Sequence, residues 1–397
     1  MVEIGDPTKA FIAKHRDDDV RNLALHPGKV DGVDLPLALR QIEGWQVALK
    51  KLPSWAEVDG LLYPPHISLE QCSSEQTALY KSRLLKGGSL VDLTGGFGVD
   101  FSYLSRKFEQ ATYVERQELL CEAASHNFPL LGLPHAEVVC AQATDFLSAM
   151  PAVDCIYLDP ARRDQYGRKV VSLVDCEPDL TLLLPALFEK SKRILVKYSP
   201  MLDLSSALAA LQGVTEVHVV ALHNECKELL FLFDRERRGE DMKIVCANLT
   251  RKGLSEISFT REEEREASCS LAKEVGKYLY EPNVSILKGG AYRLLSQRYS
   301  VSKLDVNTHL YTSDEMVPDF PGRIFEVESC FSMGKSELKQ NLAGVESANL
   351  SVRNFPQTVL QLRTKLKLKE GGDLYLFATT LAGKKVLVKC TKATSVD

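Results

Sequence analysis

The sequence lacks the features that define several large classes of protein. No stretch reaches about 18 uninterrupted apolar residues, so no membrane-spanning helix is expected. The ten cysteines form no CxxC pair and the eight histidines form no HxxxH or HExxH cluster, which leaves structural zinc, a disulfide framework and metal-dependent chemistry without support. Residues 1–25 are charged throughout and have no apolar core of the signal-peptide kind. We therefore expect a cytoplasmic protein with no metal and no membrane contact.

The sequence also has little net charge of either sign. The chain of 397 residues contains 49 Lys+Arg and 53 Asp+Glu, a net charge of −4, which excludes a wholly basic nucleic-acid-binding protein. The charge is nevertheless segregated, because residues 321–397 contain 12 Lys+Arg and 7 Asp+Glu. That segment carries +5 and the rest of the chain −9. Segregation of this kind is what an RNA-binding tail needs on an enzyme whose overall net charge is small.

The length suggests two to four domains of about 100–200 residues each, and the pattern of the sequence divides the chain into four parts. Residues 1–85 are mainly helical, with apolar side chains at helical spacing over residues 35–52. Another helix begins with Ser73 or Ser74 as its N-cap. Capping by Ser73 would place Gln76 at the third helical position of a capping box.

Residues 86–235 alternate between short apolar runs and helical stretches. The strand candidates are SLVDL, ATYVE, AEVVCA, DCIYLD, RILVKY, EVHVVAL and ELLFLF, and helical patterns separate the first five. This alternation predicts an α/β domain with a parallel, helix-covered sheet. Residues 236–320 form an α+β region with strands at KIVCANL and SEISFT and a charged loop at residues 261–266, and residues 321–397 form the last part.

The basic tail contains two further signals. Gly371-Gly372 lies between two alternating runs, which predicts a hairpin. Arg363, Lys365, Lys367 and Lys369 occupy alternate positions, so on a strand they would project from one face. We predict that Lys365, Lys367 and Lys369 bind an RNA phosphate backbone. The alternative is a solvated sheet face whose lysines protect an edge.

The most informative segment is LVDLTGGFGVD, residues 90–100. An apolar strand ends at Asp92, a loop of small residues follows, and a helical pattern resumes near Phe101. Glycines at positions 95, 96 and 98 let the backbone approach a ligand closely. A dinucleotide fingerprint is disfavoured because Phe101 occupies its third glycine position, and a P-loop is excluded because no GK[ST] follows.

Acidic and polar residues follow the next two strands. Glu115 ends the second strand, where a carboxylate is suited to binding two ribose hydroxyls. This spacing occurs in both dinucleotide and S-adenosylmethionine folds. The third strand is followed by QATDFL, where Gln142 or Asp145 can bind an adenine amino group and Ala143 offers a neighbouring backbone donor.

These features together resemble the class I S-adenosylmethionine-dependent methyltransferases. The loop DLTGGFG is similar to their DxGxGxG motif, with Thr94 in place of the first glycine. The alternative is a glycine-rich turn in another α/β domain. The resemblance implies a Rossmann-like sheet and S-adenosylmethionine as cofactor. The residues that it implies for cofactor binding are Asp92, Thr94, Gly95, Gly96, Phe97, Gly98, Glu115, Gln142, Ala143 and Asp159.

The fourth strand ends in DPARR, and Asp159-Pro160 falls where many nucleic-acid methyltransferases carry [DN]PP[YF]. In that motif an oxygen accepts a hydrogen bond from the target amine and so directs its lone pair toward the methyl group, while the aromatic residue stacks on a flipped base. Here the aromatic is absent, and the guanidinium of Arg162 can stack on a base or bind a phosphate. We predict Asp159, Pro160 and Arg162 as catalytic and Arg163 as substrate-binding. Alternatively, each arginine pairs with a local carboxylate such as that of Asp164 or Asp175.

The DPxR pattern is also similar to that of the uracil carbon-5 methyltransferases, which need a cysteine nucleophile. The corresponding segment, LVKYSPM, has no cysteine, and Cys176 is the nearest one downstream of the motif and is interpreted as structural. Direct transfer to a nitrogen is therefore preferred. Lys197 and Tyr198 of this segment are predicted to face the mouth of the pocket and contact the substrate.

Nearly the whole chain looks like a bacterial methyltransferase family with a C-terminal THUMP-like domain. The resemblance is carried by ISLEQCSSEQTALYK, DLTGGFGVD, YLDPARR and the tail from FEVESCFSMGK to KKVLVKC. It implies a ferredoxin-like region between the catalytic and THUMP-like parts, and RNA (tRNA or rRNA) as partner. The preferred function is methylation of an RNA base nitrogen. The alternatives are a small-molecule O- or N-methyltransferase and a non-catalytic RNA-binding protein with a vestigial cofactor fold.

Overall fold

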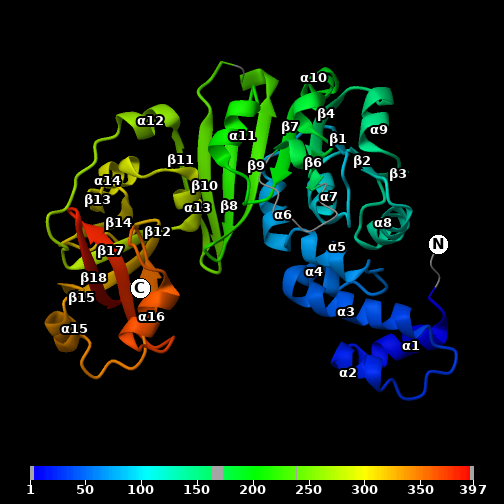
Figure 1. The fold of residues 1–397 in the computed structure, drawn as a ribbon. Helices are drawn as coiled ribbons and strands as arrows, with labels where there is room; N and C mark the ends of the chain where they lie inside the picture. Colours follow the sequence, from blue (N-terminus) through cyan, green and yellow to red (C-terminus); the bar gives the residue numbers. More distant parts are fainter. Residues whose placement is uncertain (1–3, 163–172, 238, 394–397) are drawn as a thin grey trace. The chain divides into compact units, whose positions relative to one another are not determined.

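The computed structural model describes residues 4–162, 173–237 and 239–393, which form two compact units (Figure 1). Unit 1 comprises Met1–Val217 and Lys227–Glu240, and unit 2 comprises His218–Cys226 and Asp241–Asp397. In the part of the chain so described, no helix is long and apolar enough to cross a membrane. The division into four domains predicted from the sequence stays a prediction.

Unit 1 begins with helices, as the sequence predicts. They are α1 (Asp6–His15), α2 (Val20–Leu25), α3 (Leu35–Lys51), α4 (Pro53–Ala56), α5 (His66–Gln71) and α6 (Glu75–Lys81). Helix α6 is capped by Ser74, whose hydroxyl accepts from the backbone N–H of Thr77. Of the two N-cap candidates that the sequence offers, the structure has Ser74, so the capping box that would follow from capping by Ser73 does not form. Because Ser74 takes the cap, the hydroxyl of Ser73 makes other contacts, described below.

The sheet of unit 1 contains five parallel strands in the order β7-β4-β1-β2-β3, with β9 antiparallel to β7. The strands are β1 (Ser89–Asp92), β2 (Gln110–Glu115), β3 (Ala136–Cys140), β4 (Val153–Leu158), β7 (Ser191–Tyr198) and β9 (Glu225–Asp234). The helices between them are α7 (Val99–Leu104), α8 (Glu118–Leu130), α9 (Ala143–Ala149), α10 (Leu180–Lys190) and α11 (Leu204–Ala210). This confirms the predicted α/β sheet.

The order of the strands indicates where a ligand can bind in unit 1. The chain leaves β1 toward β2 on one side, whereas β4 lies on the other side of β1, so the direction of winding reverses at β1. In open α/β sheets, ligands bind at the carboxyl ends of the strands beside such a reversal. The short antiparallel pair β5 (Ala161–Arg162) and β6 (Cys176–Glu177) follows β4 at this end.

Strand β8 (Glu216–Leu222) begins in unit 1 and continues into unit 2, and unit 2 contains the antiparallel hairpin of β10 (Lys243–Thr250) and β11 (Gly253–Thr260). The next segment, predicted as a charged loop, is helix α12 (Arg261–Glu266). A capping box between Thr260 and Glu263 satisfies backbone N–H groups at the start of this helix. All six of its residues are charged, and the sequence offered no apolar period to reveal it.

A second sheet has the order β13-β14-β12-β15-β18-β17-β16. Its strands are β12 (Tyr278–Pro282), β13 (Ser302–Asp305), β14 (Thr308–Ser313), β15 (Gly322–Ser332), β16 (Asn349–Val352), β17 (Leu374–Leu381) and β18 (Lys384–Lys392). The remaining helices are α13 (Val284–Gly289), α14 (Arg293–Tyr299), α15 (Lys335–Asn341) and α16 (Val359–Leu366). Apolar side chains on β17 and β18, including Leu376 and Leu387, pack with Leu362 of α16 in one core.

The structure contradicts two predictions for the tail. The segment with alternating lysines is not a strand: Arg363 and Lys365 lie in helix α16, which a capping box between Thr358 and Gln361 initiates and Leu362 anchors in the core, and Lys369 lies beyond its end. Lys367 ends this helix in the left-handed conformation at φ 56°. The hairpin turn lies at Ala382-Gly383, between paired Leu381 and Lys384, and not at Gly371-Gly372.

Candidate active site

A cavity of about 770 Å³ lies at the carboxyl ends of the unit 1 strands. The cofactor-site residues predicted from the sequence all line it: Asp92, Thr94, Gly95, Gly96, Phe97, Gly98, Glu115, Gln142, Ala143 and Asp159. Pro160, Lys197 and Tyr198 line it as well. The structure thus brings residues from five strand ends to one cavity, because the carboxyl ends of parallel strands meet at the same edge of a sheet.

The glycine loop after β1 is shaped by contacts that exclude side chains. A Cβ on residue 98 would lie 2.9 Å from the ring of Phe128, and Gly98 has φ 84°, which favours glycine. Gly96 also has a positive φ, of 55°, and its carbonyl accepts a hydrogen bond from the hydroxyl of Tyr113. The loop therefore presents bare backbone to the cavity.

Glu115 ends β2 and is buried, yet it borders the cavity. One oxygen, Oε2, accepts from the backbone N–H of Gly96 at 2.9 Å. The other, Oε1, accepts from the backbone N–H groups of Arg116 and Gln117, both at 2.9 Å. Each carboxylate oxygen has two lone pairs, so this carboxylate organises the loop and retains acceptor capacity for a ligand.

Asp92 and Thr94 join the loop to the neighbouring strands. Asp92 is buried, and burial raises the pKa of its carboxyl well above the usual range. Its Oδ1 accepts from the backbone N–H of Thr94 at 2.9 Å. The hydroxyl of Thr94 in turn accepts from the backbone N–H of Asp159 at 2.6 Å. A glycine at position 94 would leave this last bond unmade.

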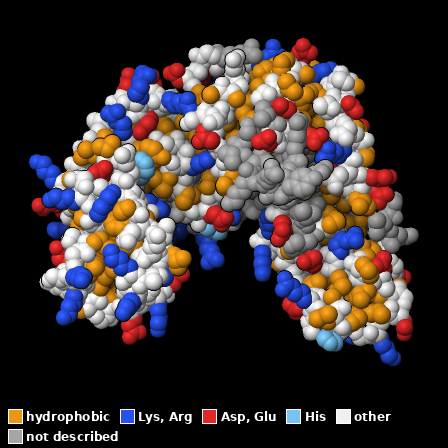
Figure 2. All heavy atoms as spheres, viewed as in Figure 1, with side chains coloured by type: hydrophobic (Ala, Val, Ile, Leu, Met, Phe, Trp, Pro, Cys, Tyr) orange, Lys and Arg blue, Asp and Glu red, His pale blue; other side chains and the backbone are white. Residues whose placement is uncertain are grey.

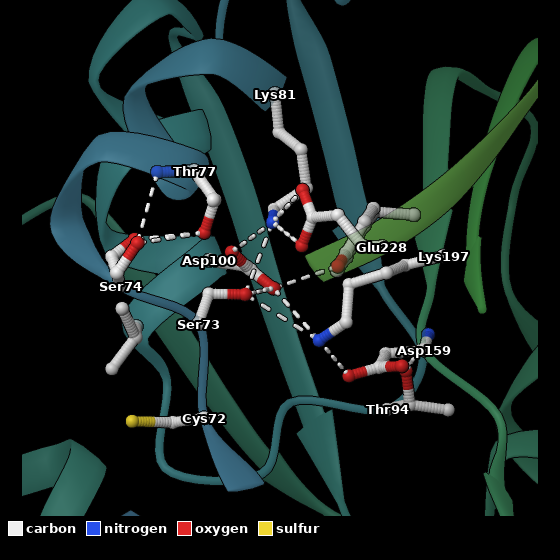
Figure 3. Close-up of polar contacts among 12 residues, drawn as sticks. Cys72, Ser73, Ser74, Thr77, Lys81, Thr94, Asp100, Asp159, Lys197 and Glu228 are labelled. Carbon is white, nitrogen blue, oxygen red and sulfur yellow. Dashed lines mark hydrogen bonds and ion pairs between the residues drawn. The ribbon is translucent and has the colours of Figure 1, made fainter. Parts of the chain in front are cut away.

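Asp159 follows β4, and Lys197 lies near the end of the adjacent β7 (Figure 3). The Lys197 ammonium donates to Oδ2 of the Asp159 carboxylate. The side chain of Asp159 remains 35% exposed, whereas that of Lys197 is only 11% exposed. Lys197 therefore lies on the cavity wall with its ammonium held by carboxylates. Its predicted contact with substrate stays a prediction.

Burial and charge act in opposite directions on this pair. Burial raises the pKa of Asp159, and the Lys197 ammonium works against that rise. Burial by itself would lower the pKa of Lys197, but the carboxylates of Asp159, Asp100 and Glu228 outweigh it and raise that pKa. Lys197 is consequently a fixed positive charge beside Asp159.

The sequence did not reveal four more residues behind this pair: Ser73, Lys81, Asp100 and Glu228 (Figure 3). The Lys81 ammonium donates to Glu228 at 2.7 and 2.6 Å and lies 3.1 Å from Oδ1 of Asp100. Oδ2 of Asp100 lies 3.5 Å from the Lys197 ammonium. Burial by itself would raise the pKa of Asp100, but the ammonium groups of Lys81 and Lys197 outweigh it and lower that pKa to about 2. The sequence signals that could have pointed to these residues are a lysine within a predicted helix, Lys81, and a glutamate at the start of an apolar run, Glu228.

A tyrosine and two cysteines also line the cavity wall. The hydroxyl of Tyr198 is buried and has no hydrogen-bond partner in residues 4–162, 173–237 and 239–393. Two cysteines, Cys72 and Cys176, also line the cavity. Burial raises the pKa of the Cys72 thiol, which makes a reactive thiolate there unfavourable. The interpretation of Cys176 as structural stays a prediction.

The remaining predicted residues have different outcomes. The backbone of Arg162 pairs with Cys176 in the β5–β6 ladder, and Arg163 lies outside the described residues. Lys365, Lys367 and Lys369 are exposed but do not share the face of a strand. Figure 2 shows lysine and arginine side chains dispersed over the visible face, among acidic ones. Among the residues placed in the structure, no group of three or more His, Cys, Asp or Glu side chains can hold a metal ion.

Comparison with known proteins adds to this geometry. Residues 278–321 match a ferredoxin-like domain family and residues 322–392 match a THUMP domain-like family. A crystal structure of a candidate methyltransferase from Porphyromonas gingivalis W83 is 37% identical, with a TM-score of 0.87, and the match covers 99% of this chain and 100% of that one. An uncharacterized S-adenosylmethionine-dependent methyltransferase from Mycobacterium tuberculosis is 22% identical over 316 residues, 79% of this chain and 83% of that protein.

The similarity to the Porphyromonas gingivalis protein extends over both units, and the curated relative uses S-adenosylmethionine. This confirms the predicted fold class, enzyme class and cofactor. The chain belongs to a family of S-adenosylmethionine-dependent methyltransferases in which a ferredoxin-like domain and a THUMP-like domain follow the catalytic sheet.

Proposed function

We propose that this methyltransferase transfers the methyl group to a base nitrogen of RNA. The observation that carries the proposal is the position of Asp159, whose carboxylate lines the same cavity as the glycine loop and is held on one oxygen by Lys197. The second oxygen, Oδ1, can then accept a hydrogen bond from an N–H group of a substrate. Target amines of bases supply such a donor, and carbon targets do not.

The lining of the cavity fits the cofactor. The glycines of the loop bring backbone to the cavity, the Glu115 carboxylate lies at the end of β2, and the Tyr198 hydroxyl lacks a partner among the residues that the structure describes. We infer that residues 92–98 hold the amino-acid part, that Glu115 binds the ribose hydroxyls, and that Gln142 and Ala143 lie beside the adenine. The cavity of about 770 Å³ also leaves room for a base.

The residues around Asp159 suit direct transfer to nitrogen. Bound S-adenosylmethionine supplies an electrophilic methyl group on a sulfonium. Asp159 accepts an N–H of the target amine and so directs the nitrogen lone pair, which is catalysis by orientation. Pro160 lacks a backbone N–H and limits the motion of the chain at this point. Lys197 weakens Asp159 as a base, so the carboxylate acts as an acceptor that positions the amine.

RNA is the proposed partner because of the C-terminal part. Residues 322–392 match the THUMP domain-like family, and the charge of +5 is concentrated in residues 321–397. We propose that exposed lysines of this part, including Lys365, Lys367 and Lys369, bind RNA phosphates, and that Arg162, Arg163 and Tyr198 contact the target nucleotide. RNA modification is also consistent with a cytoplasmic location, which is part of the proposal.

The test is transfer of tritiated methyl from S-adenosylmethionine. Total RNA from a strain without this gene is compared with the small-metabolite fraction of the same cells. We expect label in RNA, and nucleoside mass spectrometry then identifies the modified atom. Asp159→Ala should abolish most turnover with cofactor affinity retained, while Asp241→Ala, an exposed control in unit 2, should match wild type. Label confined to the metabolite fraction would overturn the proposal.

A further inference from the structure

Five charged side chains form a largely buried cluster at the wall of the cavity, here called the ion network (Figure 3). They are Lys81 of α6, Asp100 of α7, Glu228 of β9, Lys197 of β7 and Asp159 after β4. The exposed fraction of the side chain rises along the network, from 0% at Lys81 through 4% at Glu228, 10% at Asp100 and 11% at Lys197 to 35% at Asp159. Asp100, Lys197 and Asp159 line the cavity, and Asp159 is the most exposed of the five.

A hydroxyl from the segment before α6 connects the two lysines of the network. The Ser73 hydroxyl accepts from Lys81 at 3.0 Å and lies 3.4 Å from the Lys197 ammonium. It donates to Oδ2 of Asp100 at 2.9 Å, and the Tyr157 hydroxyl donates to the same oxygen at 2.7 Å. Asp100 is thereby fixed from several sides, and Lys197 lies between the fixed Asp100 and Asp159.

A purely stabilising role does not explain this arrangement well. Buried ion pairs contribute little net stability, because removing charges from water costs about as much as their attraction returns. The network instead determines where one carboxylate lies. Since Lys197 holds Oδ2 of Asp159, the oxygen Oδ1 is left to accept from the substrate.

We propose that Lys197 is a positioning residue for Asp159, and that Ser73 and Lys81 of the N-terminal segment keep Lys197 in place through Asp100. This inference rests on the proposed function of Asp159. It makes the N-terminal segment part of the active site, although that segment lies outside the sheet. Two ammonium groups and three carboxylates leave the network one negative charge, which favours the positive charge that develops on a methylated amine.

The charged environment gives the proposal a signature in pH. The titratable groups facing Lys197 and Asp159 are Asp100, Glu228, Lys81, Lys51, Cys72, Asp92, Tyr157 and Tyr198. Burial raises the pKa of Asp159, and Lys197 is the strongest group opposing that rise. Removing the ammonium raises the pKa further, so an enzyme that needs ionised Asp159 loses activity at a higher pH as the solution is acidified.

The first experiment compares Lys197→Met with Lys192→Met, a control on the same strand whose side chain is 72% exposed. Methyl transfer to total RNA is measured against pH, and affinity for S-adenosylmethionine is measured by calorimetry. We expect Lys197→Met to lower kcat by about 100-fold, to move the acid limb of kcat to higher pH, and to leave cofactor affinity unchanged. Lys192→Met should behave as wild type.

A second variant keeps all five charges, in case Lys197→Met does not fold. Ser73→Ala removes only the connecting hydroxyl, and we expect kcat to fall about tenfold with cofactor affinity unchanged. Ser82→Ala is its control, because that hydroxyl donates to the Leu79 carbonyl away from the network. Wild-type kcat in Ser73→Ala, or a loss in Lys197→Met with an unshifted acid limb, overturns the inference.

Failure of the proposed function can be distinguished from failure of the positioning role. If wild-type enzyme labels no RNA, the function is wrong, whereas an active wild type with unaffected variants contradicts only the positioning role. The contact itself can be followed without substrate by NMR of lysine side-chain ammonium groups. Asp159→Asn should change the Lys197 signal and leave that of Lys192 in place, and an unchanged Lys197 signal contradicts the proposed contact.

Discussion

The ring of Tyr113 occupies the space that a side chain at position 95 would need, because a Cβ on Gly95 would lie 2.1 Å from its Cε2 atom. The backbone N–H of Gly95 also donates to the carbonyl of Val114 at 2.9 Å, so the loop cannot move aside without breaking that bond. The glycine at position 95 is thus required by the packing of β2 against the loop, as well as by approach to a ligand.

Gly95→Ala should therefore displace the glycine loop, which we propose holds the cofactor. Overpacking of this kind costs about 1–3 kcal/mol, and we expect a lower free energy of unfolding together with weaker binding of S-adenosylmethionine. Both are measurable, by urea denaturation and by calorimetry. Gly132→Ala is the control, because nothing lies within 4 Å of a Cβ there and only its φ of 74° opposes the change. Cofactor affinity equal to wild type in Gly95→Ala would contradict the role of this contact.

Thr94→Val should uncouple the loop from the strand that carries Asp159. The valine keeps the shape of threonine but cannot accept the 2.6 Å hydrogen bond from the backbone N–H of Asp159. Leaving that donor without a partner should reduce the free energy of unfolding by about 1–3 kcal/mol. Thr94→Ser retains the hydroxyl and should stay near wild type. Equal stability of the valine and serine variants would show that the bond contributes nothing.

Glu115→Ala should weaken cofactor binding by roughly 1.5–3 kcal/mol, measured by calorimetry. The alanine removes the proposed contact to the ribose and also the acceptor of three backbone N–H groups, at Gly96, Arg116 and Gln117. A lower thermal midpoint should accompany the loss. Glu118→Ala, an exposed change in the first turn of α8, serves as control. An unchanged dissociation constant in Glu115→Ala removes the assignment of this strand end.

His309 of β14 makes unit 2 sensitive to acid. Its ring stacks on Tyr292 with centroids 3.6 Å apart, and burial, with Lys303 and Arg353 nearby, lowers its pKa from 6.5 to about 4. Between these values the unfolded chain binds a proton that the folded chain does not, so stability falls as the pH drops through this range. Above pH 6.5 neither the folded nor the unfolded chain binds this proton, so the histidine no longer makes the stability depend on pH.

His309→Phe keeps a ring on Tyr292 and removes the titration. The variant should lose less free energy of unfolding than wild type between about pH 7 and about pH 4.5, as measured by urea denaturation at each pH. His26→Gln, an exposed histidine of unit 1, should keep the wild-type dependence on pH. Parallel curves for wild type and His309→Phe would contradict a buried neutral histidine.

Changing Lys365, Lys367 and Lys369 together to Gln should reduce RNA affinity and flatten its salt dependence. If all three bind phosphates of single-stranded RNA, the slope of log K against log salt should fall by about 2 units. Lys243, Lys252 and Lys273 are exposed lysines of the same unit and form the matched control set. Because the three tail lysines do not share a strand face, single changes should be unequal. An unaltered slope would identify them as a solvated surface only.

The sequence by itself determined the architecture of the catalytic sheet and predicted the glycine loop after Asp92 as its cofactor site. Alternating apolar runs and helices, a glycine-rich turn after Asp92 and a carboxylate at Glu115 are local patterns, and each depends on residues within one strand-loop-helix segment. Carboxyl ends of parallel strands share an edge, so even the gathering of Asp92, Glu115 and Asp159 at one cavity followed from local signals.

Only the tertiary structure decided which charges meet. Lys81 and Glu228 are 147 residues apart, and nothing in either local sequence names the other as its partner. The tail shows the same limit at shorter range: its lysines alternate as on a strand, but a capping box at Thr358 and the burial of Leu362 against the sheet make the segment helical. Packing of an apolar side chain outweighs a pattern among exposed ones, because exposed side chains gain little from either conformation.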